Sequence, residues 1–121
     1  MNLEEIAKKM VAKGKGILAA DESTGTMGKR LQSVNVESTP ENRLNFRETL
    51  FSSEGMKNFI GGVILFEETL KQKSTKGISI PDLIMQNGSI PGIKVDKGAK
   101  TLAGSPDEKI IEGLDGLRER L

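Results

Sequence analysis

The sequence contains neither cysteine nor histidine. Without cysteine it can form no disulfide framework and no thiolate metal site. A zinc site would have only carboxylate side chains as ligands, which is not the ligand set that zinc usually takes in proteins. Acid–base chemistry therefore depends on Asp, Glu or Lys, and we expect neither a bound metal nor a cofactor.

Aromatic side chains are also scarce, with four Phe, no Tyr and no Trp among 121 residues. Unpaired nucleic-acid bases would find few stacking partners on such a chain. The 18 basic and 17 acidic residues leave a net charge of +1, which creates no field that would attract a polyanion or an anionic membrane. We therefore expect no nucleic-acid partner and no membrane partner.

Long hydrophobic runs are missing as well. No apolar stretch approaches the roughly 20 residues of a membrane-spanning helix. The first residues lack the apolar segment of a signal peptide, so we expect a cytoplasmic protein. The length suits a single small domain over residues 1–121.

Helical patterns occupy much of what is present. Residues 2–12 carry apolar side chains at helical spacing, and Asn2 and Glu5 stand at the spacing of a capping box. Thr39-Pro40 is typical of a helix start. We expect further helices after Thr26, over residues 81–87, and near the C-terminus, where the apolar side chains are Ile110, Ile111, Leu114, Leu117 and Leu121.

Three short apolar runs, Gly16–Asp21, Gly61–Phe66 and Gly92–Asp96, predict strands. The first has the composition of a strand that is buried on both faces of a parallel sheet. Helical segments of suitable length separate the runs, which indicates an α/β fold with parallel strands and right-handed crossovers. A doubly wound sheet and a barrel both fit this pattern.

Charged residues follow these strands at the end where parallel α/β folds place their functional groups. Asp21, Glu67, Lys94 and Asp96 occupy such positions, and the last two share one face because they are two residues apart. A lysine beside a carboxylate can bind an anionic substrate, or it can form an imine if burial lowers its pKa. The alternatives are a structural Lys94–Asp96 ion pair and a helix-capping role for Asp21.

The turn Ser23–Thr26 is rich in hydroxyl groups and enters a helix that carries Lys29 and Arg30 one turn later. Backbone N–H groups at such a helix start favour phosphate, and the hydroxyls and cations would add hydrogen bonds. The turn lacks the glycine spacing of a P-loop, and Ser and Thr are common helix caps. A capping role alone is therefore the alternative.

Four blocks, residues 14–26, 61–70, 91–98 and 114–120, resemble class I fructose-bisphosphate aldolases in order and spacing. The resemblance is to the N-terminal portion of the family, and it implies an incomplete (β/α)₈ TIM barrel of about three parallel strands with helices. The family is a group of glycolytic carbon–carbon lyases. They cleave fructose 1,6-bisphosphate to dihydroxyacetone phosphate and glyceraldehyde 3-phosphate through a lysine Schiff base, without metal.

The resemblance also implies roles for five residues. Asp21 resembles the aspartate that takes part in proton transfer, and Lys94 resembles a lysine that contacts substrate near the Schiff-base centre. Ser23 and Thr26 resemble positions that bind the aldehyde-half phosphate, although Thr26 is more often Ser in the family. Arg30 resembles the arginine near that phosphate.

The Schiff-base lysine, the acid–base glutamate and the ketose-phosphate site lie on later strands of the family, so we expect the chain alone to be inactive. The amphipathic pattern runs to Leu121 without a helix-ending residue, and a full barrel needs about 250 residues. We therefore expect the sequence to continue in a longer protein. Residues 105–112 depart from the family sequence and are interpreted as a loop.

A sugar phosphate is the expected partner, and full-length members of the family oligomerise. Two alternatives differ in class. One is a natural short protein that binds sugar phosphates or assembles with its own copies as a scaffold. The other is a different Schiff-base aldolase of related barrel type.

Overall fold

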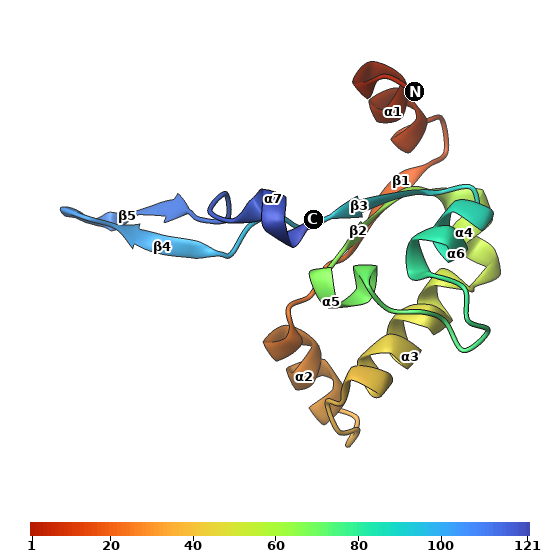
Figure 1. Cartoon of the computed structure of the whole chain (residues 1–121), viewed down its shortest axis with the longest axis horizontal. Coiled ribbons are helices and arrows are strands. Elements are labelled where there is room, and N and C mark those ends of the chain that lie inside the picture. The colour runs from red at the N-terminus through yellow and green to blue at the C-terminus, as the bar shows by residue number, and fades with distance from the viewer.

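A three-stranded parallel sheet organises the computed structural model, which describes all residues 1–121 (Figure 1). Its strands are β1 (Gly16–Ala20), β2 (Ile60–Leu65) and β3 (Ile90–Ile93), and β2 lies between the other two. Both strand pairs are parallel. The three predicted strands and their parallel arrangement are therefore confirmed. Three adjacent parallel strands occur both in barrels and in doubly wound sheets.

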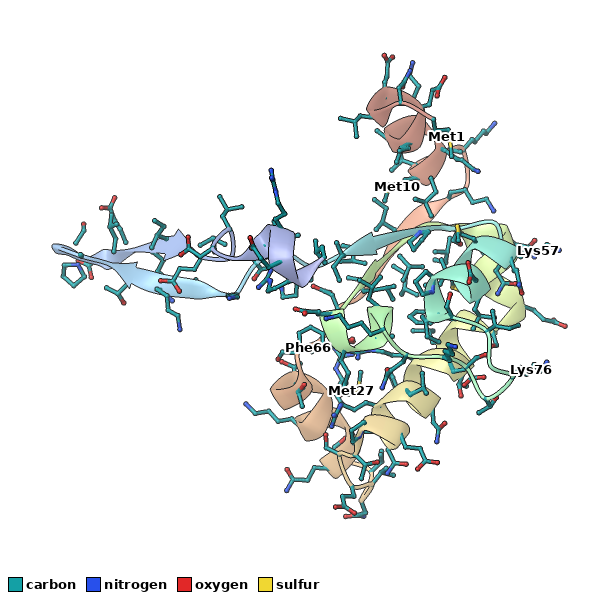
Figure 2. The ribbon with its side chains drawn as sticks, viewed as in Figure 1. Met1, Met10, Met27, Lys57, Phe66 and Lys76 are labelled. Carbon is teal, nitrogen blue, oxygen red and sulfur yellow. The ribbon has the colours of Figure 1, made fainter.

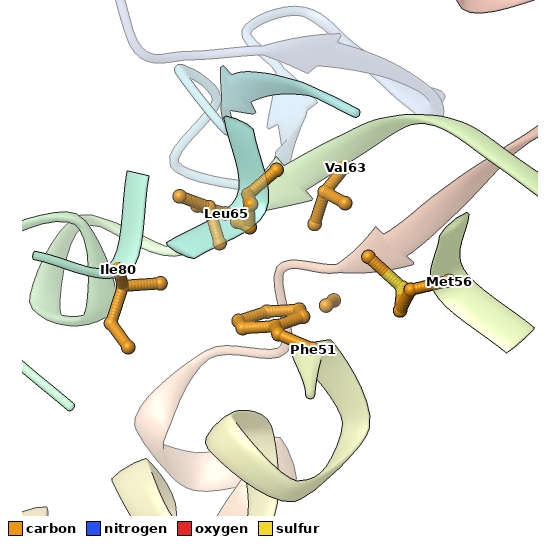
Figure 3. Close-up of a cluster of buried hydrophobic side chains, with 7 residues drawn as sticks. Phe51, Met56, Val63, Leu65 and Ile80 are labelled. Carbon is orange, nitrogen blue, oxygen red and sulfur yellow. The ribbon is translucent and has the colours of Figure 1, made fainter. Parts of the chain in front are cut away.

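Helices cover one face of this sheet and enclose the hydrophobic core (Figures 1 and 3). The covering helices are α3 (Pro40–Phe51), α4 (Glu54–Phe59) and α6 (Ile80–Gln86). The core cluster combines side chains of these helices with side chains from two strands: Ala20, Phe51, Met56, Val63, Leu65, Ile80 and Ile84. Aliphatic side chains therefore fill most of the core, as expected from a sequence with four aromatic residues.

The prediction that the first strand is buried on both faces is wrong. Along β1 only Ala20 is buried, and Ile17 is 46% exposed. The reason is its place in the sheet, because β1 is an edge strand that pairs only with β2. The central strand β2 does have the predicted burial, with Val63 and Leu65 fully enclosed.

Helix α1 (Leu3–Met10) begins with the predicted capping box between Asn2 and Glu5. Its last turn lies against the start of β2, and this contact requires glycine in the strand. A Cβ atom at Gly61 would lie 2.1 Å from the carbonyl oxygen of Met10, and one at Gly62 would lie 2.5 Å from the Met10 side chain. Met10 is labelled at the end of α1 in Figure 2. No residue of α1 is buried, so its apolar face is open in this chain.

Two further helices begin at residues that the sequence indicates as caps. Ser23 caps α2 (Thr24–Gln32), and Thr39 caps α3 with Pro40 at its first turn. Gly88 ends α6 with a φ of +80°, which is the left-handed conformation that favours glycine. The short helix α5 (Glu67–Leu70) follows β2 directly. None of the helices is both long and apolar enough to cross a bilayer.

The predicted C-terminal helix is largely wrong. Residues 99–111 form an antiparallel hairpin of β4 (Ala99–Leu102) and β5 (Ser105–Ile111), which projects away from the sheet (Figure 1). Ile110 and Ile111 are β-branched and favour extended backbone. Gly113 and Gly116 have positive φ, so helix is confined to α7 (Leu117–Arg120).

Two further predictions about the C-terminal part differ from the structure. Residues 105–112, interpreted as a loop, are mostly strand β5. The third strand of the parallel sheet ends at Ile93 rather than Asp96. Lys94 still continues the ladder by one bond, because its N–H donates to the carbonyl oxygen of Leu65 at 2.9 Å.

Candidate active site

An open cavity of about 460 Å³ lies at the carboxyl ends of β1 and β3. Its walls come from the segment after β1, the first two turns of α2 and the segment after β3. All five site residues predicted from the sequence line it: Asp21, Ser23, Thr26, Arg30 and Lys94. Side chains from three separate segments of the chain therefore converge on one hollow.

Lys94 and two carboxylates form the polar centre of this cavity. The Lys94 Nζ lies 2.5 Å from Asp96 Oδ2 and 3.4 Å from Asp21 Oδ2. The side chains of Lys94 and Asp21 are each about a quarter exposed, at 25% and 26%. The Lys94–Asp96 ion pair is thus present, and the same ammonium group also faces Asp21 and the cavity.

The hydrogen bond from Lys94 to Asp96 raises the pKa of the lysine, and Asp21 adds to this effect. The same bond lowers the pKa of Asp96, whose second carboxylate oxygen accepts the N–H of Gly98 at 3.0 Å. Lys94 is therefore an ammonium ion at neutral pH. Such a group can hold an anion or donate a hydrogen bond, whereas imine formation needs a neutral amine.

The start of α2 forms the hydroxyl-lined wall of the cavity. Ser23 Oγ accepts the backbone N–H of Thr26 at 3.3 Å, and the two hydroxyl oxygens are 3.2 Å apart. Ser23 therefore does cap the helix, as the alternative interpretation holds, and both hydroxyl groups remain exposed. The capping role of Asp21 is not observed, because Ser23 occupies the N-cap position.

Two residues of this region were missed by sequence reasoning. Glu22 pairs with the predicted Arg30 and is only 12% exposed. Arg47 of α3 is completely buried, and its Nη2 lies 3.7 Å from Glu22 Oε2. Arg47 lies on the buried face of its helix, but no local signal in the sequence links it to Glu22, which lies 25 residues away in the chain.

Two other cavity residues were also not predicted, and one predicted strand-end residue lies elsewhere. Lys97 and Gly98 line the cavity beside Asp96. Glu67 is not among the lining residues and instead pairs with Lys71 on the surface at 3.0 Å. The hydrogen bond from Lys71 lowers the pKa of Glu67. No group of three or more Asp and Glu side chains is placed to hold a metal ion.

A parallel α/β sheet that gathers cations and hydroxyls at the carboxyl ends of its strands is the arrangement of barrel enzymes that act on small anionic substrates. The family model described as "Fructose-bisphosphate aldolase class-I" matches residues 2–121. The chain therefore belongs to the class I fructose-bisphosphate aldolase family, and the predicted resemblance is confirmed.

Individual relatives agree with this assignment. The chain is 58% identical over 118 residues to fructose-bisphosphate aldolase 1 of Toxoplasma gondii, covering 98% of this chain and 32% of the relative. It is 57% identical over 119 residues to fructose-bisphosphate aldolase B of Gallus gallus, covering 98% of this chain and 33% of the relative. The chain thus spans about a third of the length of these relatives.

A solved structure supports the fold in the same way. The Plasmodium falciparum fructose-bisphosphate aldolase, determined in complex with TRAP and a small-molecule inhibitor, superposes with a TM-score of 0.89 at 50% identity. The match covers 96% of this chain and 33% of that one. Of the two folds that the strand pattern allows, the chain therefore has that of an incomplete barrel of the TIM family.

Proposed function

We propose that this chain supplies the aldehyde-phosphate half of the active site of a class I fructose-bisphosphate aldolase. The complete enzyme cleaves fructose 1,6-bisphosphate reversibly to dihydroxyacetone phosphate and glyceraldehyde 3-phosphate. The observation that carries this proposal is the convergence of Asp21, Ser23, Thr26, Arg30 and Lys94 on one cavity. Family membership supports the reaction class.

The phosphate site consists of the α2 start and the cation beside it. A phosphate bound there accepts hydrogen bonds from the exposed hydroxyls of Ser23 and Thr26, and from the helix N-terminus. The Arg30 guanidinium, whose side chain is 56% exposed, supplies a charge-assisted contact at the rim. This arrangement holds the aldehyde end of the substrate and directs its carbon chain toward Lys94.

Asp21 and Lys94 act on the reacting part of the sugar. Lys94 is held as an ammonium ion, so it stabilises negative charge rather than attacking the ketone. Asp21 shares that ion pair and accepts the proton of the sugar hydroxyl, whose oxygen becomes the aldehyde carbonyl as the carbon–carbon bond breaks. The Schiff-base lysine, which provides the electron sink, belongs to the longer enzyme, and this chain alone is inactive.

Borohydride trapping with fructose 1,6-bisphosphate tests the catalytic part of the proposal. An imine on the chain would be reduced to a stable adduct that is visible by mass spectrometry, and we expect none. An adduct on Lys94 would overturn the assignment of this lysine as a charge-stabilising group. A full-length aldolase of the family, treated in parallel, serves as the positive control.

Calorimetric titration with glyceraldehyde 3-phosphate tests the binding part. We expect R30A to weaken binding more than T49A, because Thr49 lies on α3 and bonds only the carbonyl oxygen of Asn45. Equal affinities of wild type, R30A and T49A would refute the assignment of the phosphate site.

A second candidate function is a self-assembling sugar-phosphate-binding scaffold. It is favoured by two observations, the open edges of β1 and β3 and the exposed apolar side chains of the hairpin, with Ile110 at 49% and Ile111 at 65%. A scaffold would give a stable oligomer in light scattering at micromolar concentration. A monomer at that concentration would exclude it.

A further inference from the structure

A buried arginine lies directly behind the candidate active site. Arg47 is completely enclosed, which is exceptional for a charged residue. Its Nη1 donates to the hydroxyl of Thr69 and its Nη2 to the carbonyl oxygen of Glu22, each at 2.5 Å. The guanidinium also lies 5.8 Å from the ring centre of Phe66. One side chain of α3 thus ties together the segments that follow β1 and β2.

Glu22 connects this arginine to the cavity. Its carboxylate lies between two guanidinium groups, the buried one of Arg47 and the exposed one of Arg30. Glu22 also separates Asp21 from Ser23 in the chain, and all three residues line the cavity. Anything that fixes the backbone and the carboxylate of Glu22 therefore fixes the two neighbouring site residues.

We propose that Arg47 is a positioning residue of the phosphate site, acting through Glu22. This inference rests on the proposed function, because it assigns how the same site is held in shape. The hydrogen bond from Arg47 to the carbonyl oxygen of Glu22 fixes the backbone from Asp21 to Ser23. The charge of Arg47 keeps the Glu22 carboxylate compensated when Arg30 turns toward a bound phosphate.

The charge argument predicts what happens without Arg47. The Glu22 carboxylate is only 12% exposed, so it would then depend on Arg30 alone for compensation. The Arg30 guanidinium would then stay paired with Glu22, and a phosphate in the cavity would gain less from it. Removing the Glu22 charge as well, in R47M/E22Q, frees Arg30 and restores part of the affinity. A purely structural role for Arg47 predicts no such recovery.

The chain offers a matched control on the same helix. Arg43 is also buried, at 6% exposure, and forms two hydrogen bonds to the carboxylate of Glu68, at 2.6 and 2.9 Å. Neither Arg43 nor Glu68 lines the cavity. R43M therefore removes a buried, paired arginine from α3 without touching the proposed site.

The test measures the affinity of the full 121-residue chain for glyceraldehyde 3-phosphate by calorimetry, for wild type, R47M, R43M and R47M/E22Q. We expect R47M to weaken binding roughly tenfold, as loss of an outer partner does at metal sites. R43M should stay within about twofold, as expected for a change away from the ligand. Circular dichroism confirms that each variant is folded, and R47K replaces R47M if the latter unfolds.

Amide NMR signals of Ser23 and Thr26, recorded without ligand, separate the two proposals. If wild type binds no sugar phosphate, the proposed function is refuted, while displaced signals in R47M but not in R43M still support the positioning of this segment. If wild type binds and R47M behaves like R43M in both measurements, the inference about Arg47 is overturned. Failure of E22Q to restore affinity in R47M would overturn the charge argument.

Discussion

The side chain of Asn87 contacts the C-terminal ends of two helices. Its replacement by aspartate, which exchanges one amide nitrogen for an oxygen, should strongly destabilise the chain. The Nδ2 of Asn87 donates to the carbonyl oxygen of Phe51, the last residue of α3, at 2.9 Å. The same nitrogen donates to the carbonyl oxygen of Leu83, in the last turn of α6, at 3.2 Å. Both acceptors carry the partial negative charge of a helix C-terminus.

The size of the effect follows from these contacts. N87D removes two donors, each contributing about 0.5–1.5 kcal/mol. It also places a carboxylate against two helix C-termini, at about 0.3–1 kcal/mol each for a partly exposed charge. We expect the free energy of unfolding to fall by about 2–5 kcal/mol, the combined range of these two effects.

Urea denaturation followed by circular dichroism at pH 7 measures this change. The matched control is N42D, which makes the same chemical change in the first turn of α3. Asn42 is partly exposed, and its side chain donates one hydrogen bond, to the carbonyl oxygen of Glu37. A carboxylate at a helix start is favourable. N42D should therefore change stability by less than about 0.5 kcal/mol. Equal effects of the two substitutions would refute the reasoning.

Three further predictions concern the interior and its ion pairs. The hydrogen bond from Arg43 lowers the pKa of Glu68 below its ordinary 4.5. The ion pair therefore stabilises the folded chain fully above that pH, and this stabilisation is lost as pH falls through the lowered pKa of the folded state. E68Q should make the melting temperature depend less on pH between about pH 5 and pH 3. The same pH dependence in E68Q and wild type would contradict this. G61A should displace α1, because its Cβ would lie 2.1 Å from Met10, and hydrogen exchange over residues 3–10 should then accelerate. L65A should cost about 2–5 kcal/mol in urea denaturation, since Leu65 is fully enclosed, and a loss below about 1 kcal/mol would contradict its place in the core.

Local patterns in the sequence were sufficient to predict most of the parallel sheet and its helices. Capping residues such as Thr39 and glycines such as Gly88 act within a few residues, so their effect is visible in the sequence. Burial depends on neighbours that are distant in the chain. For that reason Ile17 belongs to an apolar run typical of an interior strand and yet lies exposed at the sheet edge.

The C-terminal third was the main error, because helix and hairpin compete there. Ile110, Ile111 and Leu114 have helical spacing, and this periodicity favours a helix. Extended backbone is preferred by β-branched residues, however, and a turn at Gly104 with a φ of +78° lets the chain fold back on itself. Pairing between Ala99 and Ile111 over the hairpin then outweighs the periodic pattern.

The candidate site was predictable where it follows a general rule of parallel sheets. Asp21 and Lys94 directly follow strands, and such positions meet at one edge of the sheet. The contact between Arg47 and Glu22 follows no such rule, since it depends on how α3 packs behind the sheet. Only the structure brings this pair together.

The hairpin begins and ends at the wall of the cavity. The N–H of Lys97 donates to the carbonyl oxygen of Glu112 at 2.8 Å, and the N–H of Glu112 donates to that of Gly98 at 3.2 Å. Because Lys97 and Gly98 also line the cavity, the base of the hairpin forms part of the cavity wall. A contact that immobilises the hairpin would therefore also restrain these two lining residues.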